Sequence, residues 1–123
     1  MVELALSHGA ESIAYTYNEP TIFYHYAKDI GVIAKEKGLK NLFVSNGFET
    51  PEVIEDMASW VDAANIDLKT WDAAYYKKVL KGGLDEVKDT LKRMIAAGIW
   101  VEVTTLLIPG ENDSDKDIEE MAA

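Results

Sequence analysis

Two kinds of short apolar segment alternate along this chain, and their order is the feature that most restricts the fold. Residues 12–17, 41–45, 63–69 and 99–108 are rich in β-branched and aromatic side chains and have the length of strands. Between them, apolar residues recur at a spacing of three and four, which is typical of amphipathic helices. Strands separated by helices pair in parallel through right-handed crossovers. The sequence therefore predicts an α/β fold with a parallel four-stranded sheet.

Residues that begin and end helices support this order. Thr50, Asp72 and Ser114 each stand where an N-cap is expected, and Gly38 stands where a helix would end. Residues 2–10 have the pattern of a helix closed by a glycine. The predicted order is therefore α–β–α–β–α–β–α–α–β–α, which equals about half of an eight-stranded βα barrel.

Composition limits the possible functions further. The 123 residues are enough for one domain, which we expect to span residues 1–123. A net charge of −10 argues against binding to nucleic acid or to an anionic membrane. The sequence has no apolar run of membrane-spanning length and no signal-peptide pattern, so we expect a cytoplasmic location. The absence of cysteine excludes disulfides, thiol nucleophiles and thiolate-bound metals within this chain.

The third strand-like segment carries an unusual polar face. Side chains alternate along a strand, so Asn65, Asp67 and Lys69 share one face, while the residues between them are apolar. Strands of parallel sheets are normally apolar on both faces, and one polar face therefore indicates a wet or ligand-filled cavity. Asp67 and Lys69 taken alone would more simply form a structural ion pair.

Polar residues also stand at the ends of the other strands. Asn18 and Glu19 follow the first strand, Ser45 and Asn46 close the second, and residues 109–113 follow the fourth. Within the fourth strand, Glu102 and Thr104 share one polar face. Each has a simple structural interpretation, such as a helix start for Glu19 or a turn at Asn46. Because ligands of parallel α/β folds bind beyond the carboxyl ends of the strands, their coincidence at four strand ends favours a binding cavity.

These segments resemble one enzyme family. Residues 12–21 (SIAYTYNEPT) resemble the second strand and its loop in radical S-adenosyl-L-methionine (SAM) enzymes, above all the pyruvate formate-lyase activating enzymes and the radical SAM members of the AmmeMemoRadiSam group. Residues 44–48 (VSNGF), 65–69 (NIDLK) and 103–113 (VTTLLIPGEND) look like the motifs of their third, fourth and fifth strands. Each motif is weak alone, but four in the family's order and spacing are specific.

The resemblance implies a fold, a reaction and a binding site. Relatives of this type are oxidoreductases in which a partial TIM-like barrel of six βα units holds SAM across its strand ends. Asn18 and Glu19 would take the amino group of the methionine part, and Ser45 and Asn46 would lie beside its carboxylate and the sugar. The cofactor-binding residues implied by the resemblance are Asn18, Glu19, Ser45, Asn46, Asp67, Lys69 and Thr104.

The chain departs from the family in the part that carries the chemistry. The family binds a [4Fe–4S] cluster through a Cys-x-x-x-Cys-x-x-Cys loop after its first strand, and the cluster cleaves SAM reductively. This chain has no cysteine, and its motifs correspond to strands two to five alone. We therefore predict no catalytic residue and no metal ligand here, and no radical chemistry from this chain by itself.

Three hypotheses remain. The favoured one is the SAM-binding segment of a larger radical SAM domain, whose parent enzyme acts on a protein or a small molecule. The second is a non-catalytic half-barrel binding module that self-associates into a homo-oligomer through its exposed sheet edges. The third is an unrelated doubly wound, flavodoxin-like domain, although no glycine-rich phosphate loop follows the first strand.

Overall fold

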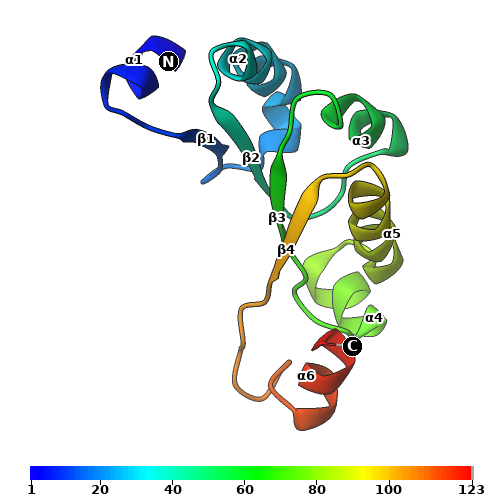
Figure 1. Cartoon of the computed structure of the whole chain (residues 1–123). Coiled ribbons are helices and arrows are strands. Elements are labelled where there is room, and N and C mark those ends of the chain that lie inside the picture. Colours follow the sequence, from blue (N-terminus) through cyan, green and yellow to red (C-terminus); the bar gives the residue numbers. More distant parts are fainter. Residues whose placement is uncertain (123) are drawn as a thin grey trace.

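The structure is a computed structural model that describes residues 1–122. Its strands are β1 (Ser12–Tyr15), β2 (Lys40–Ser45), β3 (Ala63–Asp67) and β4 (Trp100–Thr104). Its α-helices are α1 (Val2–Ser7), α2 (Tyr24–Glu36), α3 (Pro51–Met57), α4 (Ala73–Tyr75), α5 (Leu84–Ala96) and α6 (Asp115–Ala122). A 3-10 turn, η1 (Pro20–Phe23), precedes α2, and a π-helical turn, η2 (Tyr76–Leu80), continues α4. Figure 1 shows this alternation along the chain.

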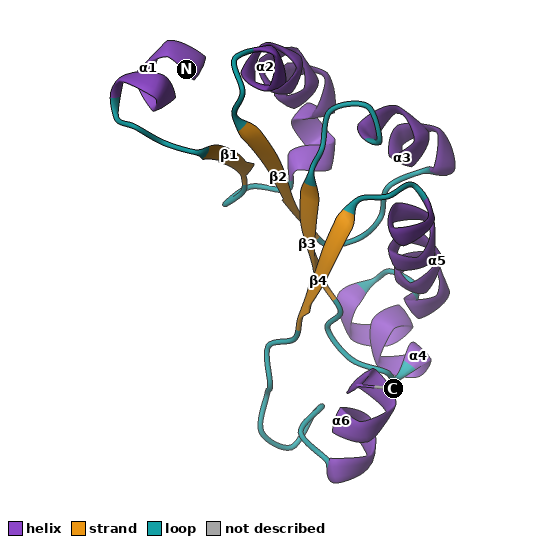
Figure 2. Cartoon of the chain, viewed as in Figure 1, coloured by secondary structure: helices purple, strands orange, loops and turns teal. Residues whose placement is uncertain are grey.

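The strands form one parallel sheet in which their spatial order, β1-β2-β3-β4, is also their order in the sequence. Right-handed crossovers between sequential neighbours place the connecting helices on one side. α2, α3 and α5 accordingly lie along the same face, and the opposite face is left open (Figures 1 and 2). The predicted α/β fold with a parallel four-stranded sheet is therefore confirmed.

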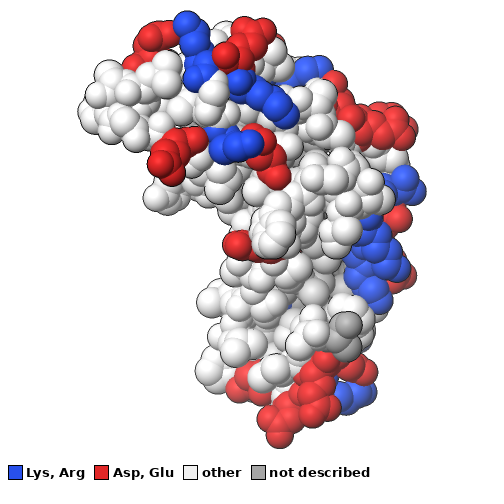
Figure 3. All heavy atoms as spheres, in the orientation of Figure 1, with Lys and Arg blue, Asp and Glu red and all other residues white. Residues whose placement is uncertain are grey.

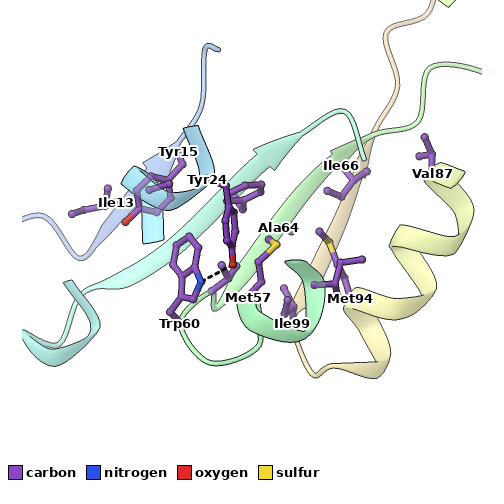
Figure 4. Close-up of a cluster of buried hydrophobic side chains, with 14 of the residues drawn as sticks. Ile13, Tyr15, Tyr24, Met57, Trp60, Ala64, Ile66, Val87, Met94 and Ile99 are labelled. Carbon is purple, nitrogen blue, oxygen red and sulfur yellow. Dashed lines mark hydrogen bonds between the residues drawn. The ribbon is translucent and has the colours of Figure 1, made fainter. Parts of the chain in front are cut away.

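Aromatic side chains fill the core between the sheet and these helices. Trp60 is buried between Tyr15 and Tyr24, and its indole Nε1 donates a hydrogen bond to the Tyr24 hydroxyl at 3.3 Å (Figure 4). The buried Asn41 side chain donates hydrogen bonds to the carbonyls of Gly31 and Trp60. These bonds fix the start of β2 against α2, because an unpaired amide would be costly at this depth.

Gly31 allows this close packing of α2. A Cβ atom at this position would lie 2.2 Å from the Trp60 ring atom Cε3, well inside van der Waals contact. Glycine lowers the helix propensity of α2 at this position, but it allows the indole of Trp60 to approach the helix backbone closely.

Three of the predicted strands are too long, and β3 ends at Asp67 instead of residue 69. β1 ends at Tyr15 because Tyr17 has a φ of 71°, a left-handed conformation that ends an extended segment. β4 ends at Thr104 instead of residue 108, so the longest predicted strand has five residues. Beyond Thr104, the Asn112 side chain accepts a hydrogen bond from the Ile108 N–H and donates one to the Leu106 carbonyl. In a longer strand these backbone groups would have bonded a neighbouring strand.

Other local predictions had mixed outcomes. Asp72 caps α4 by accepting from the N–H of Ala74, whereas Thr50 makes no side-chain cap bond to α3. Trp100 is 70% exposed on β4. In the described part of the chain, no helix is long and apolar enough to cross a membrane. Acidic side chains gather over α6 (Figure 3).

Candidate functional site

The loops after β1 and β2 and the end of β3 enclose a cavity of about 250 Å³. It lies at the carboxyl ends of the strands, where the sequence places the polar residues. Its lining consists of Thr16, Tyr17, Asn18, Glu19, Val44, Ser45, Asn46 and Asp67. The parallel sheet brings these segments together because all of its strands end at the same edge.

Glu19 is the most extensively bonded side chain at this edge. Its Oε1 accepts from the backbone N–H of Thr21 at 3.2 Å and lies 2.8 Å from the Thr21 and Ser45 hydroxyl oxygens. Its Oε2 accepts from the backbone N–H of Asn46 at 2.9 Å. Glu19 thus caps η1, as the sequence allows, and also joins the loop after β1 to the end of β2. Oε2 retains a lone pair for a further donor, since each carboxylate oxygen can accept two.

A second carboxyl group lies beneath Glu19. Glu49, in the loop between β2 and α3, is only 6% exposed, and its Oε1 contacts the Ser45 hydroxyl and lies 3.0 Å from the Thr21 hydroxyl. Its Oε2 is buried and has no hydrogen-bond partner among residues 1–122. Burial raises the pKa of the Glu49 carboxyl, an effect that the neighbouring charge of Glu19 reinforces.

On β3, the polar face predicted from the sequence is present. Asp67 Oδ2 lies 2.5 Å from Lys69 Nζ, so the two side chains form an ion pair that is partly open to solvent. The adjacent strand β4 places Thr104 opposite Asp67 in the register, and the Thr104 hydroxyl donates to Asn65 Oδ1 at 2.9 Å. This polar row lies on the open face of the sheet, away from the helices.

The backbone around Lys69 is held by two residues that the sequence analysis did not select. The Tyr76 hydroxyl, on η2, accepts from the Lys69 N–H at 3.0 Å, and Asn112 donates through Nδ2 to the Lys69 carbonyl at 2.6 Å. Asn112 is 1% exposed and also bonds Leu106 and Ile108. The segment after β4 is thereby fastened to the segment after β3.

The structure brings most of the predicted site residues together. Asn18, Glu19, Ser45, Asn46 and Asp67 all line the cavity. Lys69 reaches it through its ion pair with Asp67, whereas Thr104 lies on the neighbouring strand and does not line it.

Sequence reasoning did not select Glu49, and it placed residues 109–113 at the strand ends without selecting Asn112 itself. Both stand in polar loop segments, where their composition gives no sign of burial. Glu49 lies four residues after Ser45, and this spacing was the one available indication that both could face the same strand end.

A comparison with protein-family models matches residues 1–122 to the radical SAM superfamily. The match covers nearly the whole chain and includes every strand of the sheet. The chain belongs to the radical SAM superfamily. The likeness inferred from the four strand-end motifs is therefore confirmed.

Curated relatives support this assignment of the radical SAM chain. An uncharacterized protein of Methanocaldococcus jannaschii is 42% identical over 118 residues, which are 96% of this chain and 34% of that protein. The benzylsuccinate synthase activating enzyme of Thauera aromatica is 30% identical over 105 residues, or 85% of this chain and 32% of the enzyme. The chain thus spans about one third of the length of these relatives.

Solved structures share the fold of this radical SAM chain. A domain of a pyruvate-formate lyase-activating enzyme from Bacteroides vulgatus superposes with a TM-score of 0.81 at 18% identity, covering 92% of this chain and 70% of that one. A structure of TYW1 with a lysine-pyruvate adduct bound superposes with a TM-score of 0.60 at 24% identity, covering 85% and 35%. The four-stranded sheet with its helices therefore resembles part of a radical SAM-type barrel.

Membership of the superfamily implies two cofactors, SAM and a [4Fe–4S] cluster. The cluster does not fit the residues present, because the chain has no cysteine and residues 1–122 contain no group of three potential His, Cys, Asp or Glu ligands. The cavity suits the amino-acid end of SAM better, since its lining combines two carboxylates, amides and hydroxyls. Its volume is smaller than the ~300–1,000 Å³ of pockets that enclose a whole ligand.

Proposed function

We propose that this chain provides the SAM-binding strand ends of a radical SAM enzyme of the glycyl-radical-activating type. The observation that supports this proposal is the position of Glu19, whose carboxylate lines the cavity while backbone N–H groups from two loops fix it. A preorganised carboxylate with a free lone pair is suited to an ammonium group, because hydrogen bonds between charged partners are strong. Glu19 would therefore take the methionine amino group.

The other predicted residues take complementary parts in this proposal. Asn18 lies beside Glu19 in the cavity lining, where its amide would also face the amino group. Asn46 and Ser45 would lie beside the methionine carboxylate and the ribose. Asp67 and Lys69, joined as an ion pair, would border the nucleoside on the open face of the sheet, with Thr104 next to them on β4. When bound in a complete enzyme, SAM supplies the 5′-deoxyadenosyl group, and this chain contributes binding and orientation.

The activating-enzyme type rests on similarity in sequence. The benzylsuccinate synthase activating enzyme shares 30% identity with 85% of this chain. The strand-end segments YNEP, SNGF and DLK, which carry the proposed contacts, resemble those of activating enzymes. No catalytic step is assigned to this chain, because none of its side chains can ligate the cluster that such a step requires.

Calorimetric titration of the chain with SAM at pH 7 tests the binding function. We expect a Kd below about 1 mM, equivalent to more than about 4 kcal/mol of binding free energy. We also expect Glu19→Gln to weaken binding by about 10- to 100-fold, the cost of losing a charged hydrogen-bond partner. Glu111→Gln is the matched control, since it removes one exposed carboxylate outside the cavity. Absence of binding to the wild-type chain would refute the proposal.

We propose, secondly, that this chain self-associates through its sheet edges. β1 and β4 form the two edges, and the β4 edge exposes Trp100 and Val103, with Leu106 and Leu107 following. Open apolar edges of this kind favour pairing with another strand. Sedimentation velocity at micromolar concentration should show a dimer that Val103→Lys converts to a monomer, whereas a monomeric wild-type chain would contradict this proposal.

A further inference from the structure

Four oxygen atoms form a closed ring beneath the cavity. Oε1 of Glu19 and Oε1 of Glu49 stand at opposite corners, and the hydroxyl oxygens of Thr21 and Ser45 stand between them. Three of the four sides measure 2.8, 3.0 and 2.8 Å, and the fourth joins Ser45 to Glu49. Every side is therefore within hydrogen-bond distance.

The number of protons decides which of these contacts can be attractive. Thr21 and Ser45 each donate one proton, so two ionised carboxylates would leave two sides of the ring as contacts between lone pairs. One further proton on Glu49 Oε1 would convert a third side into a hydrogen bond. The Ser45 hydroxyl would then accept from Glu49 and from the Gly47 N–H at 3.1 Å, and it would donate to Glu19. These three bonds use the one proton and both lone pairs of the Ser45 hydroxyl.

The surroundings of Glu49 also favour its neutral form. Its Oε2 is buried without a partner among the described residues, and an ionised carboxylate would place part of its charge on that atom. Glu19, from the loop after β1, is the charged side chain that faces it. α5 contributes the uncharged Thr90, whose hydroxyl lies 3.5 Å from the Glu49 carbonyl oxygen. A negative charge at Glu49 would therefore be desolvated and would lie next to a like charge.

We propose that Glu49 is a positioning residue of the site: its neutral carboxyl donates a proton into the ring and, through Ser45 and Thr21, holds Glu19 in place for a cationic ligand. The ring then carries one negative charge, that of Glu19, which suits a ligand with a single ammonium group. The consequence for binding rests on the proposed function, whereas the protonation of Glu49 does not depend on SAM.

Stability should depend on pH in a defined direction. Burial raises the pKa of Glu49 above its ordinary value of 4.5 in the folded chain. The stabilising contribution of neutral Glu49 is therefore complete below that ordinary value and is lost as the pH rises through the raised pKa. The free energy of unfolding of the wild-type chain should decrease over this interval.

Glu49→Gln distinguishes this account from an ordinary structural role. An amide nitrogen in the ring can donate to both hydroxyls, and each hydroxyl can then donate to Glu19, so that all four sides become hydrogen bonds. The variant should match or exceed the wild-type stability above the raised pKa and lose the pH dependence. Glu52→Gln is the matched control, because it removes an exposed carboxylate three residues away and should leave that dependence intact.

The direct test is carbon-13 NMR of the wild-type chain labelled at the glutamate Cδ atoms, with the Glu49 signal assigned by its loss in Glu49→Gln. As the pH is lowered, we expect the Glu49 carboxyl to take up its proton at a higher pH than the Glu52 carboxyl, whose pKa is lowered. In SAM titrations, Glu49→Ala should weaken binding at least tenfold and Glu49→Gln should recover most of the loss.

A Glu49 carboxyl that titrates no higher in pH than Glu52, or a Glu49→Gln variant that keeps the pH dependence of stability, would overturn the proposal. If Glu49→Gln binds SAM no more tightly than Glu49→Ala, the proposed effect of Glu49 on SAM binding is wrong. If the wild-type chain binds no SAM, the proposed function fails, and the NMR titration still decides the protonation of Glu49.

Discussion

The carboxylate of Glu19 accepts a hydrogen bond from the backbone N–H of Asn46 at 2.9 Å, so that one side chain joins the ends of β1 and β2. The same carboxylate accepts from the N–H of Thr21 in its own loop. Together with the hydroxyls of Thr21 and Ser45, these backbone groups fix Glu19, so that it holds its position at the cavity without a ligand. This preorganisation is what a binding group requires, because ordering it on binding would cost affinity.

Ser45→Ala should destabilise the chain. Ser45 is buried, and its hydroxyl contacts both Glu19 and Glu49 and accepts from the Gly47 N–H. Removing it leaves buried groups without a partner, at a cost of about 1–3 kcal/mol in the free energy of unfolding, measurable by urea denaturation. Ser59→Ala is the control, since among residues 1–122 the exposed Ser59 hydroxyl bonds only the Asp56 carbonyl. This substitution should cost less than about 0.5 kcal/mol. Equal losses would contradict the importance of the ring.

Asn112→Ala should loosen the segment after β4. The side chain makes three hydrogen bonds, to the carbonyls of Lys69 and Leu106 and from the N–H of Ile108. We expect a loss of about 2–4 kcal/mol, together with faster amide hydrogen exchange at Ile108. Asp113→Ala, which removes one exposed contact to the Gly110 N–H, should have a much smaller effect. Unchanged exchange at Ile108 in Asn112→Ala would show that other contacts hold this segment.

Gly31→Ala should destabilise α2 although alanine is the better helix former. The added Cβ would lie 2.2 Å from Trp60 Cε3, and the resulting displacement should cost about 1–3 kcal/mol. Helix propensity alone predicts a gain of about 1 kcal/mol, so the sign of the change decides between the two effects. Thermal unfolding followed by Trp fluorescence measures both the stability and the packing around Trp60.

Asp56 should stabilise the fold in a pH-dependent way. Its carboxylate accepts from Lys28 Nζ and from the Tyr24 hydroxyl, both at 2.6 Å, and these bonds lower the pKa of Asp56 below its ordinary value of 3.8. Its contribution is therefore present above that value and is lost as the pH falls through the lowered pKa. Asp56→Asn should cost about 0.5–1.5 kcal/mol at pH 7 and nearly nothing in strong acid, because the pair is partly exposed. A constant cost across the range would contradict this role.

Much of the fold follows from the order of apolar segments. The parallel sheet, the order of elements along the chain and the polar face of β3 were predicted because alternation of side chains and of elements is a local property of the sequence. The end of β4 could not be predicted in this way. The composition of residues 105–108 is typical of a strand, but their backbone groups bond the Asn112 side chain. That contact depends on how the following loop folds back.

The sequence predicted which strand ends form the candidate site, but it did not predict the hydrogen bonds among the site residues. Glu19, Ser45 and Asp67 stand at strand ends, and parallel strands necessarily bring their ends together. Glu49 could not be identified from its sequence position, because its burial depends on the β2–α3 loop turning back under Glu19. The left-handed conformation of Gly47, with a φ of 84°, permits that turn.

The central claim is that the carboxylate of Glu19 takes the amino group of SAM. The most direct measurement is a coupling cycle by calorimetry, in which SAM and its N-acetyl derivative are each titrated into the wild-type chain and into Glu19→Gln. We predict that acetylation weakens binding to the wild-type chain by about tenfold or more and has little effect on Glu19→Gln, because the two changes remove the same interaction. Equal losses on acetylation in both proteins would contradict the claim.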